Sequence, residues 1–242
     1  MPRLAPLLAL ALLLWTPLAA AQAPSDDDVW DGGYQVKNER RSDFALGIGY
    51  GLAMGEAHGV MNEVEQLNDD SYERSTGLAV GTDLAVWLGG AIRDWFVVGV
   101  GVGFGGSQGN DILVARQTYH LKIDFYPAYS AGGAWRDLGV QIDGGVGGLL
   151  GLDASDTDER VFEGGSVSAL GAGAFWEGLR FARGRFGAGP LLHYRLLSGL
   201  PSTAHTVTLG MRLTFYSGPK HAKSDAQPAT AAALLPQFPT SF

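Results

Sequence analysis

The sequence predicts an all-β protein, an eight-stranded antiparallel up-and-down β-barrel that crosses a membrane. Eight stretches of roughly 10 to 13 residues alternate large apolar side chains with small or polar ones, and a period of two is typical of a strand whose faces meet different surroundings. A tilted membrane strand needs about 9–11 residues, whereas strands of soluble proteins more often have about 5–6. The composition agrees, with 46% hydrophobic residues, 17% charged residues and 36 glycines.

The N-terminus predicts export. Arg3 precedes an apolar run, Leu4–Leu14, and small residues follow as far as Ala23. This order is typical of a secretory signal peptide, which is cleaved after Ala21 or after Ala23. The run is too short to cross about 30 Å of hydrocarbon as a helix. Residues 1–23 are therefore interpreted as the signal peptide and residues 24–41 as a polar periplasmic leader.

The strands follow in order along the chain. The first is the clearest, because Phe44, Leu46 and Ile48 alternate with alanine and glycine. The sixth is rich in Gly, Ala and Ser, and its facing is ambiguous. Residues 42–216 are interpreted as the barrel and residues 217–242 as a disordered tail rich in Ala and Pro. The predicted strands lie at 44–54, 78–88, 96–104, 119–125, 138–147, 165–176, 185–196 and 206–215.

The predicted connections alternate between long and short. Membrane barrels of this kind have long extracellular loops and short periplasmic turns, so an even strand number leaves both termini in the periplasm. The long connections are 55–76, 105–116 and 152–164, the short ones are 91–94, 130–136 and 178–184, and 198–204 is intermediate.

Two sets of side chains are singled out by this threading. The first is an aromatic girdle, the ring that such barrels place at the membrane interface: Trp87, Trp95, Tyr126, Tyr129, Trp135, Trp176, Phe215 and Tyr216. The second is a set of polar and charged side chains expected inside the lumen: Asp83, Lys122, Asp124, Asp143, Arg185, His193, Arg195 and Arg212. Charges in a narrow lumen must pair, because an unpaired buried charge costs several kcal/mol. They form either a structural network that plugs the barrel or a gate in a narrow pore.

Three strands carry a resemblance to a known group. FALGIGYGLAM at 44–54, FVVGVGVGF at 96–104 and VTLGMRLTF at 207–215 resemble the small eight-stranded outer-membrane barrels, which include the OmpA transmembrane domain, OmpX and OmpW. The resemblance covers residues 42–216 and implies a location in the outer membrane, contact with lipids and lipopolysaccharide, and insertion by the barrel-assembly machinery. The closing strand of this group usually ends the chain; here Phe215, rather than Phe242, is interpreted as the assembly signal.

Motifs that could carry chemistry are weak. Gly105–Gly109 matches G-x-S-x-G around Ser107, and Gly101–Gly106 matches G-x-G-x-x-G, but no helix follows either one. One outer-membrane enzyme of this architecture, the lipid A deacylase, uses a His and a Ser two residues apart, whereas His193 and Ser198 are five apart. The acidic stretch from Asp153 through Asp156 and Asp158 to Glu159 lacks EF-hand spacing and is interpreted as a solvated loop.

The sequence therefore predicts no catalytic residue, no metal site and no cofactor. The absence of cysteine excludes disulfides, a Cys-ligated metal and a lipoprotein anchor. The excess of 25 Asp and Glu over 17 Lys and Arg argues against nucleic acid as a partner. The predicted function is a structural or surface-interaction barrel whose long loops meet an extracellular ligand. The alternatives are a narrow channel for small solutes or ions and a lipid A-modifying enzyme.

Overall fold

The computed structural model describes residues 41–60, 70–131, 133–182 and 184–218. The predicted signal peptide, nearly all of the predicted leader and nearly all of the C-terminal tail lie outside these residues. Within the described part of the chain, no helix is long and apolar enough to cross a membrane.

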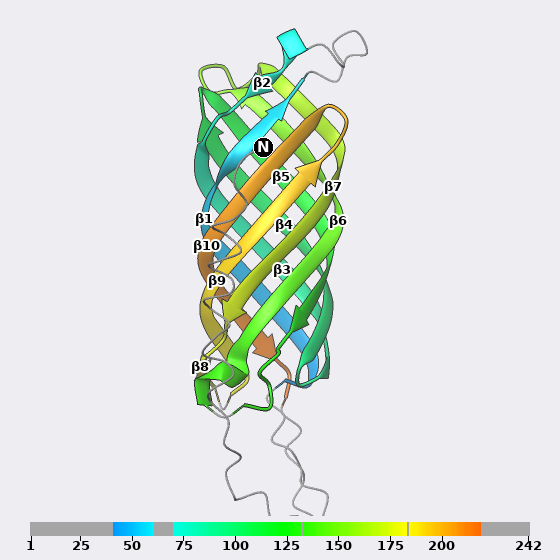
Figure 1. Ribbon diagram of the computed structural model, residues 1–242, viewed down its shortest axis with the longest axis vertical. Coiled ribbons are helices and arrows are strands. Elements are labelled where there is room, and N and C mark those ends of the chain that lie inside the picture. Colours follow the sequence, from blue (N-terminus) through cyan, green and yellow to red (C-terminus); the bar gives the residue numbers. More distant parts are fainter. Residues whose placement is uncertain (1–40, 61–69, 132, 183, 219–242) are drawn as a thin grey trace, which may run out of the picture. The chain divides into compact units, whose positions relative to one another are not determined.

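Eight long antiparallel strands form a closed barrel (Figure 1). Each strand pairs with the next one along the chain, and the last, β10, pairs with both β9 and β1. The prediction of an eight-stranded up-and-down barrel is confirmed. The strands are β1 (Asp43–Gly59), β3 (Ala79–Arg93), β4 (Phe96–Gly109), β5 (Ile112–Phe125), β6 (Leu138–Asp153), β7 (Arg160–Trp176), β9 (Phe186–Ser198) and β10 (Ser202–Tyr216).

Four short elements lie at the two ends of the barrel. The outer end, as we name it, carries the connections β1–β3, β4–β5, β6–β7 and β9–β10; the inner end is where the chain enters β1 and leaves β10. At the outer end, the 3-10 helix η2 (Asp70–Tyr72) precedes β2 (Arg74–Ser75), which pairs with β1. At the inner end lie the 3-10 helix η3 (Gly133–Asp137) and β8 (Leu179–Phe181), which pairs with β9.

The barrel wall separates an apolar exterior from a polar interior. Leu121 on the outer face is 66% exposed, whereas its neighbour Lys122 on the inner face is 4% exposed. The same alternation holds along β1, where Leu52 is exposed and Ala53 is buried. In hydrocarbon every backbone N–H and C=O must be paired, and a closed barrel satisfies them between strands. An apolar outer surface on a closed barrel is therefore the surface of a transmembrane barrel.

Inward-facing glycines make room for large inward side chains. In one row across the sheet the register is Gly47, Trp87, Gly101, His120, Gly145, so that each large side chain has glycine on both neighbouring strands. A Cβ on Gly101 would lie 2.6 Å from Nε2 of His120 and 3.0 Å from Cβ of Trp87. The need for space beside large inward side chains explains much of the high glycine content.

The connection lengths differ from the prediction. The stretch 105–116, expected to be a long loop, is mostly strand, because β4 and β5 meet at a two-residue turn of Asn110 and Asp111. These residues have φ of 44° and 60°, the left-handed conformation that a tight type I′ hairpin turn requires. At the inner end, the connection after β5 is longer than expected and includes η3. The alternation of long and short connections was therefore wrong in these places, although the strand count was right.

Replacement of Gly101 by alanine should destabilise the barrel by about 1–3 kcal/mol, because the added methyl group overpacks the seat of His120 and Trp87. Gly165→Ala is the matched control, since a Cβ there meets nothing within 4 Å. The measurement is the temperature at which the folded band in a detergent gel converts to the unfolded band. A conversion temperature for Gly101→Ala equal to that of the control would contradict the seating.

Candidate functional site

The lumen holds seven of the eight polar and charged residues that the sequence analysis placed there. The seven are buried: Asp83, Lys122, Asp124, Asp143, His193, Arg195 and Arg212. Arg185 is the exception and corrects the prediction. It is exposed in the turn before β9, where its backbone N–H donates to the carbonyl of Ala182. Because β9 begins at Phe186, strand alternation does not apply to Arg185.

Asp83 organises the outer half of the charged lumen. Its carboxylate lies 3.5 Å from Nη2 of Arg116 and 3.7 Å from Nη1 of Arg195. It also accepts a hydrogen bond of 3.1 Å from the hydroxyl of Thr208. Arg116 donates in addition to the Thr206 hydroxyl at 2.9 Å. Four strands, β3, β5, β9 and β10, are thereby joined across the lumen.

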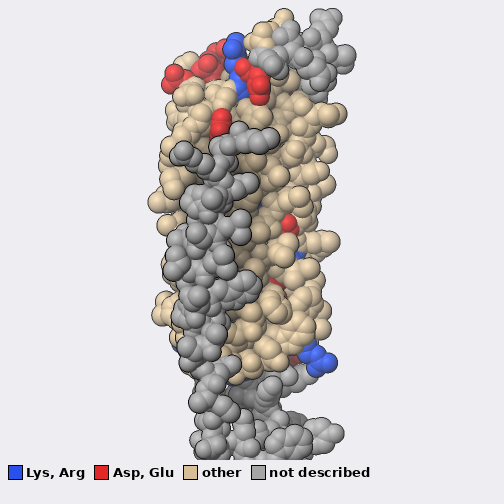
Figure 2. Space-filling view, viewed as in Figure 1, with Lys and Arg blue, Asp and Glu red and all other residues tan. Residues whose placement is uncertain are grey.

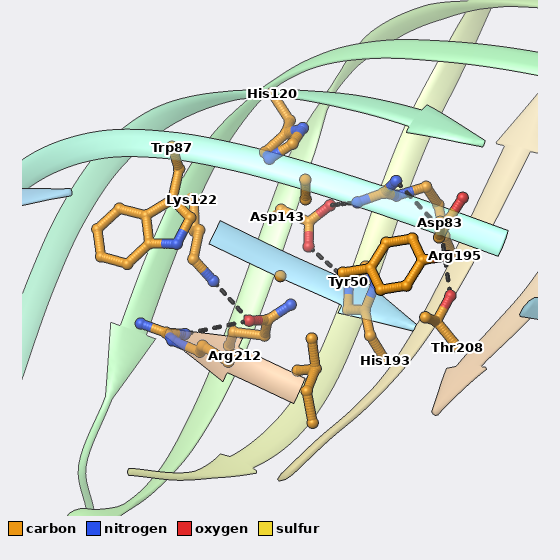
Figure 3. A pocket seen from close by; sticks show the side chains of 14 residues that line it. Tyr50, Asp83, Trp87, His120, Lys122, Asp143, His193, Arg195, Thr208 and Arg212 are labelled. Atoms are coloured by element: carbon orange, nitrogen blue, oxygen red, sulfur yellow. Dashed lines mark hydrogen bonds and ion pairs between the residues drawn. The ribbon is translucent and has the colours of Figure 1, made fainter. Parts of the chain in front are cut away.

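Asp143 forms the next layer, shown in Figure 3. It lies 2.7 Å from Nε2 of His193 and 3.7 Å from Nη2 of Arg195, so Arg195 bridges the two layers. A cavity of about 30 Å³ lies among these side chains, and His120 and Lys122 also line it. About 10–15 Å³ of such volume is enough to hold one water molecule, so this polar cavity has room for water. The charged side chains therefore fill most of the middle of the lumen and leave a small polar cavity between them.

Asp124 and Arg212 form the inner layer. The carboxylate of Asp124 lies 2.7 Å from Nζ of Lys122 and 2.5 Å from Nη2 of Arg212. The guanidinium of Arg212 also lies over the rings of Phe175 and Trp87, with 3.9 Å and 4.9 Å to the ring centroids. A weakly hydrated guanidinium can stack on aromatic faces while pairing with carboxylates at its edge.

Glu177, immediately after β7, lies at the centre of the inner end of the lumen. It accepts hydrogen bonds from the hydroxyls of Thr214 at 2.6 Å, Tyr216 at 2.9 Å and Tyr126 at 3.2 Å, and pairs with Nε of Arg212 at 2.9 Å. Burial alone would raise the pKa of Glu177, but Arg212, Arg180 and Arg41 outweigh it, so the pKa lies below its ordinary value. Burial and the Glu177 charge raise the pKa of Tyr126 well above its usual value. We name Glu177 with Thr214, Tyr216, Tyr126 and Arg212 the Glu177 cluster. It is an ionised carboxylate held by neutral hydroxyls and guanidiniums.

Arg41 joins this inner end from outside the strands. Its guanidinium lies 2.6 Å from the carboxylate of Asp137 and 3.4 Å from that of Asp94, and 3.5 Å above the ring of Tyr126. The side chain is completely buried. Arg41 was assigned to the polar leader, yet its contacts belong to the barrel.

The outer end of the lumen is closed by apolar packing. Phe162, Leu149 and Leu197 are almost fully buried and meet above the charged layers. We name this cluster the apolar plug; its members are Ala57, Ile112, Val114, Leu149, Phe162, Val167, Ala169, Leu197 and Ala204. With the Glu177 cluster at the other end, the lumen is packed at both ends and holds one small cavity in its charged middle.

Three of the predicted girdle aromatics lie inside the barrel instead. Trp87, Tyr126 and Tyr216 are buried, because they share the inward face with Asp83, Asp124 and Arg212 at even sequence spacing. Of the other five, Trp135 is 51% exposed and Trp95 is 36% exposed, whereas Tyr129, Trp176 and Phe215 are half-buried.

The candidate catalytic groups do not assemble. His193 points into the lumen, whereas Ser198 is exposed, because an odd separation puts them on opposite faces of β9. Ser107 is buried within β4 and lies 3.4 Å from Nη1 of Arg116. In the acidic loop, Asp153 accepts hydrogen bonds from Ser155. No group of three or more potential ligands with the geometry of a metal site occurs among the described residues.

Several lumen residues were not in the set that the sequence analysis singled out, although His120 lies in a predicted strand at even spacing from Lys122. Arg116 and His120 lie on the same inward face of β5 as Lys122 and Asp124. The predicted strand began at 119, so Arg116 was left in a loop; the even spacing from Lys122 could have identified it. Glu177 and Arg41 lie outside the alternating strands, and no sequence signal places them in the lumen.

Comparison with known proteins gives similarity to solved structures only. No protein-family model and no curated protein matches the chain. Ail of Yersinia pestis is 12% identical, with a TM-score of 0.42, over 72% of this chain and 99% of that one. Neisserial surface protein A is 11% identical, with a TM-score of 0.40, over 71% and 96%. OprG of Pseudomonas aeruginosa is 11% identical, with a TM-score of 0.36, over 73% and 98%. At these identities the likeness is one of fold alone.

The Glu177 cluster predicts a loss of stability in acid. A carboxylate whose pKa is lowered by folding stabilises the folded state above its unfolded pKa, and this contribution is lost as the pH falls toward the folded value. Glu177→Gln should therefore be destabilised by about 3 kcal/mol at pH 7, and the difference from wild type should shrink below the ordinary pKa of 4.5.

Denaturant unfolding of the refolded barrel in a non-ionic detergent, followed by tryptophan fluorescence, measures this difference. Glu163→Gln is the control, because Glu163 is part of an exposed ion pair with Arg160. A Glu177→Gln variant that loses the same free energy of unfolding at every pH would show that the carboxylate charge is not involved.

Proposed function

We propose that this chain is a closed outer-membrane barrel with a structural or surface-interaction role, whose lumen conducts neither solutes nor ions. The observation that supports the proposal is the filling of the lumen. The apolar plug occupies the outer end, paired charges occupy the middle, and the Glu177 cluster occupies the inner end. Water and ions need a continuous wetted path, and buried apolar packing does not provide one.

The exposed apolar band and the outer end of the barrel face different parts of the proposed outer-membrane environment. We propose that the exposed apolar band contacts outer-membrane lipids and lipopolysaccharide, with the outer end facing the outside of the cell. Phe215 lies near the end of the closing strand, with its ring 5.1 Å from that of Phe186. We propose it as part of the signal to the barrel-assembly machinery. Residues 1–23 are proposed as the cleaved signal peptide.

A narrow channel remains the second candidate, and one observation favours it. Charged side chains of both signs line the lumen in layers from Arg116 through Asp143 to Glu177. Movement of the apolar plug would be required to open it.

Planar-bilayer recording of the refolded barrel tests the proposal. We expect no conductance steps above the bilayer baseline, with a detergent-gel shift of the same sample as proof that the barrel is folded. The double variant Leu149→Ala and Phe162→Ala, which thins the apolar plug, serves as the comparison and should leak more than wild type. Regular steps from the wild-type barrel would contradict the closed lumen and favour the channel.

A further inference from the structure

A polar cleft of about 470 Å³ opens at the outer end of the barrel, above the apolar plug. Its residues come from the first connection, the β4–β5 turn, the β6–β7 connection and the adjoining ends of β5, β6 and β7. Ile112 belongs to both the cleft and the plug. Figure 2 shows charged side chains gathered at this end. The lining consists of Tyr72, Arg74, Asn110, Asp111, Ile112, Asp153, Glu159, Arg160 and Val161.

The walls of the cleft are held by backbone contacts. The N–H of Ala154 donates to the carbonyl of Asp111 at 2.7 Å, which fastens the third connection to the β4–β5 turn. The N–H of Thr76 donates to the carbonyl of Ala57 at 2.8 Å, which fastens the first connection to β1. The side chain of Asn110 packs against Gly77, where a Cβ would lie 2.8 Å from its Nδ2. The cleft is therefore built between anchored segments.

Several polar groups of the cleft have no partner within the described part of the chain. The side chains of Arg74, Asp111 and Glu159 make no hydrogen bond or ion pair with other described residues. Arg160 pairs at 2.6 Å with Glu163, which does not line the cleft. Tyr72 adds an aromatic ring that is 48% exposed. Carboxylates that only accept hydrogen bonds, guanidiniums that only donate them, and the aromatic ring of Tyr72 thus line the same cleft.

This mixture selects a chemical class of ligand. Carboxylates only accept hydrogen bonds, guanidiniums only donate them, and a hydroxyl group does both. A ligand of a single charge sign would meet repulsion from one half of the lining, whereas a polyhydroxylated neutral ligand satisfies both halves. The ring of Tyr72 suits the apolar C–H face of a sugar. These properties match a saccharide.

We propose that this cleft binds a neutral saccharide chain through Tyr72, Arg74, Asp111 and Glu159. The inference rests on the proposed surface-interaction role and names the ligand class of that role. The saccharide comes either from the cell's own lipopolysaccharide or from a glycan outside the cell, since both present the same hydroxyl chemistry.

Calorimetric titration of the full chain in lipid nanodiscs tests the proposal. The probes are maltohexaose and mannohexaose for external glycans, and the dephosphorylated core oligosaccharide of the producing cell for its own lipopolysaccharide. Each is added to about 10 mM, which occupies most of a site even with a millimolar Kd. We expect binding of at least one probe, and the one that binds identifies the source.

Two cleft variants and two matched controls locate the site. Tyr72→Ala and Glu159→Gln should each weaken binding by about tenfold, the effect of losing about 1.4 kcal/mol. Tyr194→Ala, an exposed tyrosine outside the cleft, and Asp158→Asn, a neighbouring loop carboxylate that does not line it, should leave binding unchanged.

Three results would overturn the proposal: no saccharide binding, binding that the cleft variants leave intact, or binding of the polycation spermine in place of all three saccharides. The bilayer recording tests the closed lumen separately. A conducting barrel that still binds saccharide in the cleft would refute the proposed closed lumen and support this inference.

Discussion

Trp87, His120 and Phe175 each extend into a lumen that is only eight strands wide. They fit because the strands beside them present glycine, as Gly47 and Gly101 do for Trp87 and as Gly139 does for Phe175. An eight-stranded barrel has just enough interior for side chains to fill. This width is the constraint on which the other features depend, because it decides that the lumen is packed with side chains and that the charged groups inside must pair with one another.

The charges satisfy that constraint in layers. Asp83, Asp143, Asp124 and Glu177 each meet a cationic side chain from another strand, and Arg195 and Arg212 connect successive layers. A buried charge without a partner would cost several kcal/mol, so the layers stabilise one arrangement of the strands. The Glu177 cluster also brings together Arg41, just before β1, and Tyr216, the last residue of β10. The first and last strands are thus joined both by their backbone ladder and by buried side chains.

Period-two alternation was sufficient to predict the strands and most of the lumen. Lys122 and Asp124 could be assigned to the interior because their neighbours Leu121 and Ile123 are large and apolar. The same rule, applied consistently, would have moved Trp87 from the girdle to the lumen. It could not find Glu177 or Arg41, which lie beyond the strands, and it misplaced Arg185, which precedes β9.

The β4–β5 turn was not predicted, because its two strands extend beyond the apolar segment, where the alternation in hydropathy is weak. The polar cleft could not be predicted, because tertiary pairing alone brings its three segments together.

The central claim is that the lumen is closed to water-borne solutes, and the lack of cysteine in the chain allows a direct test. Single cysteines at Thr208, buried beside Asp83 in the lumen, and at Ser155, exposed in an outer connection, can be treated with a membrane-impermeant thiol reagent in folded barrels. The account predicts that Ser155→Cys reacts at once, and that Thr208→Cys reacts only after unfolding. Equal reaction rates at the two positions in the folded barrel would contradict it.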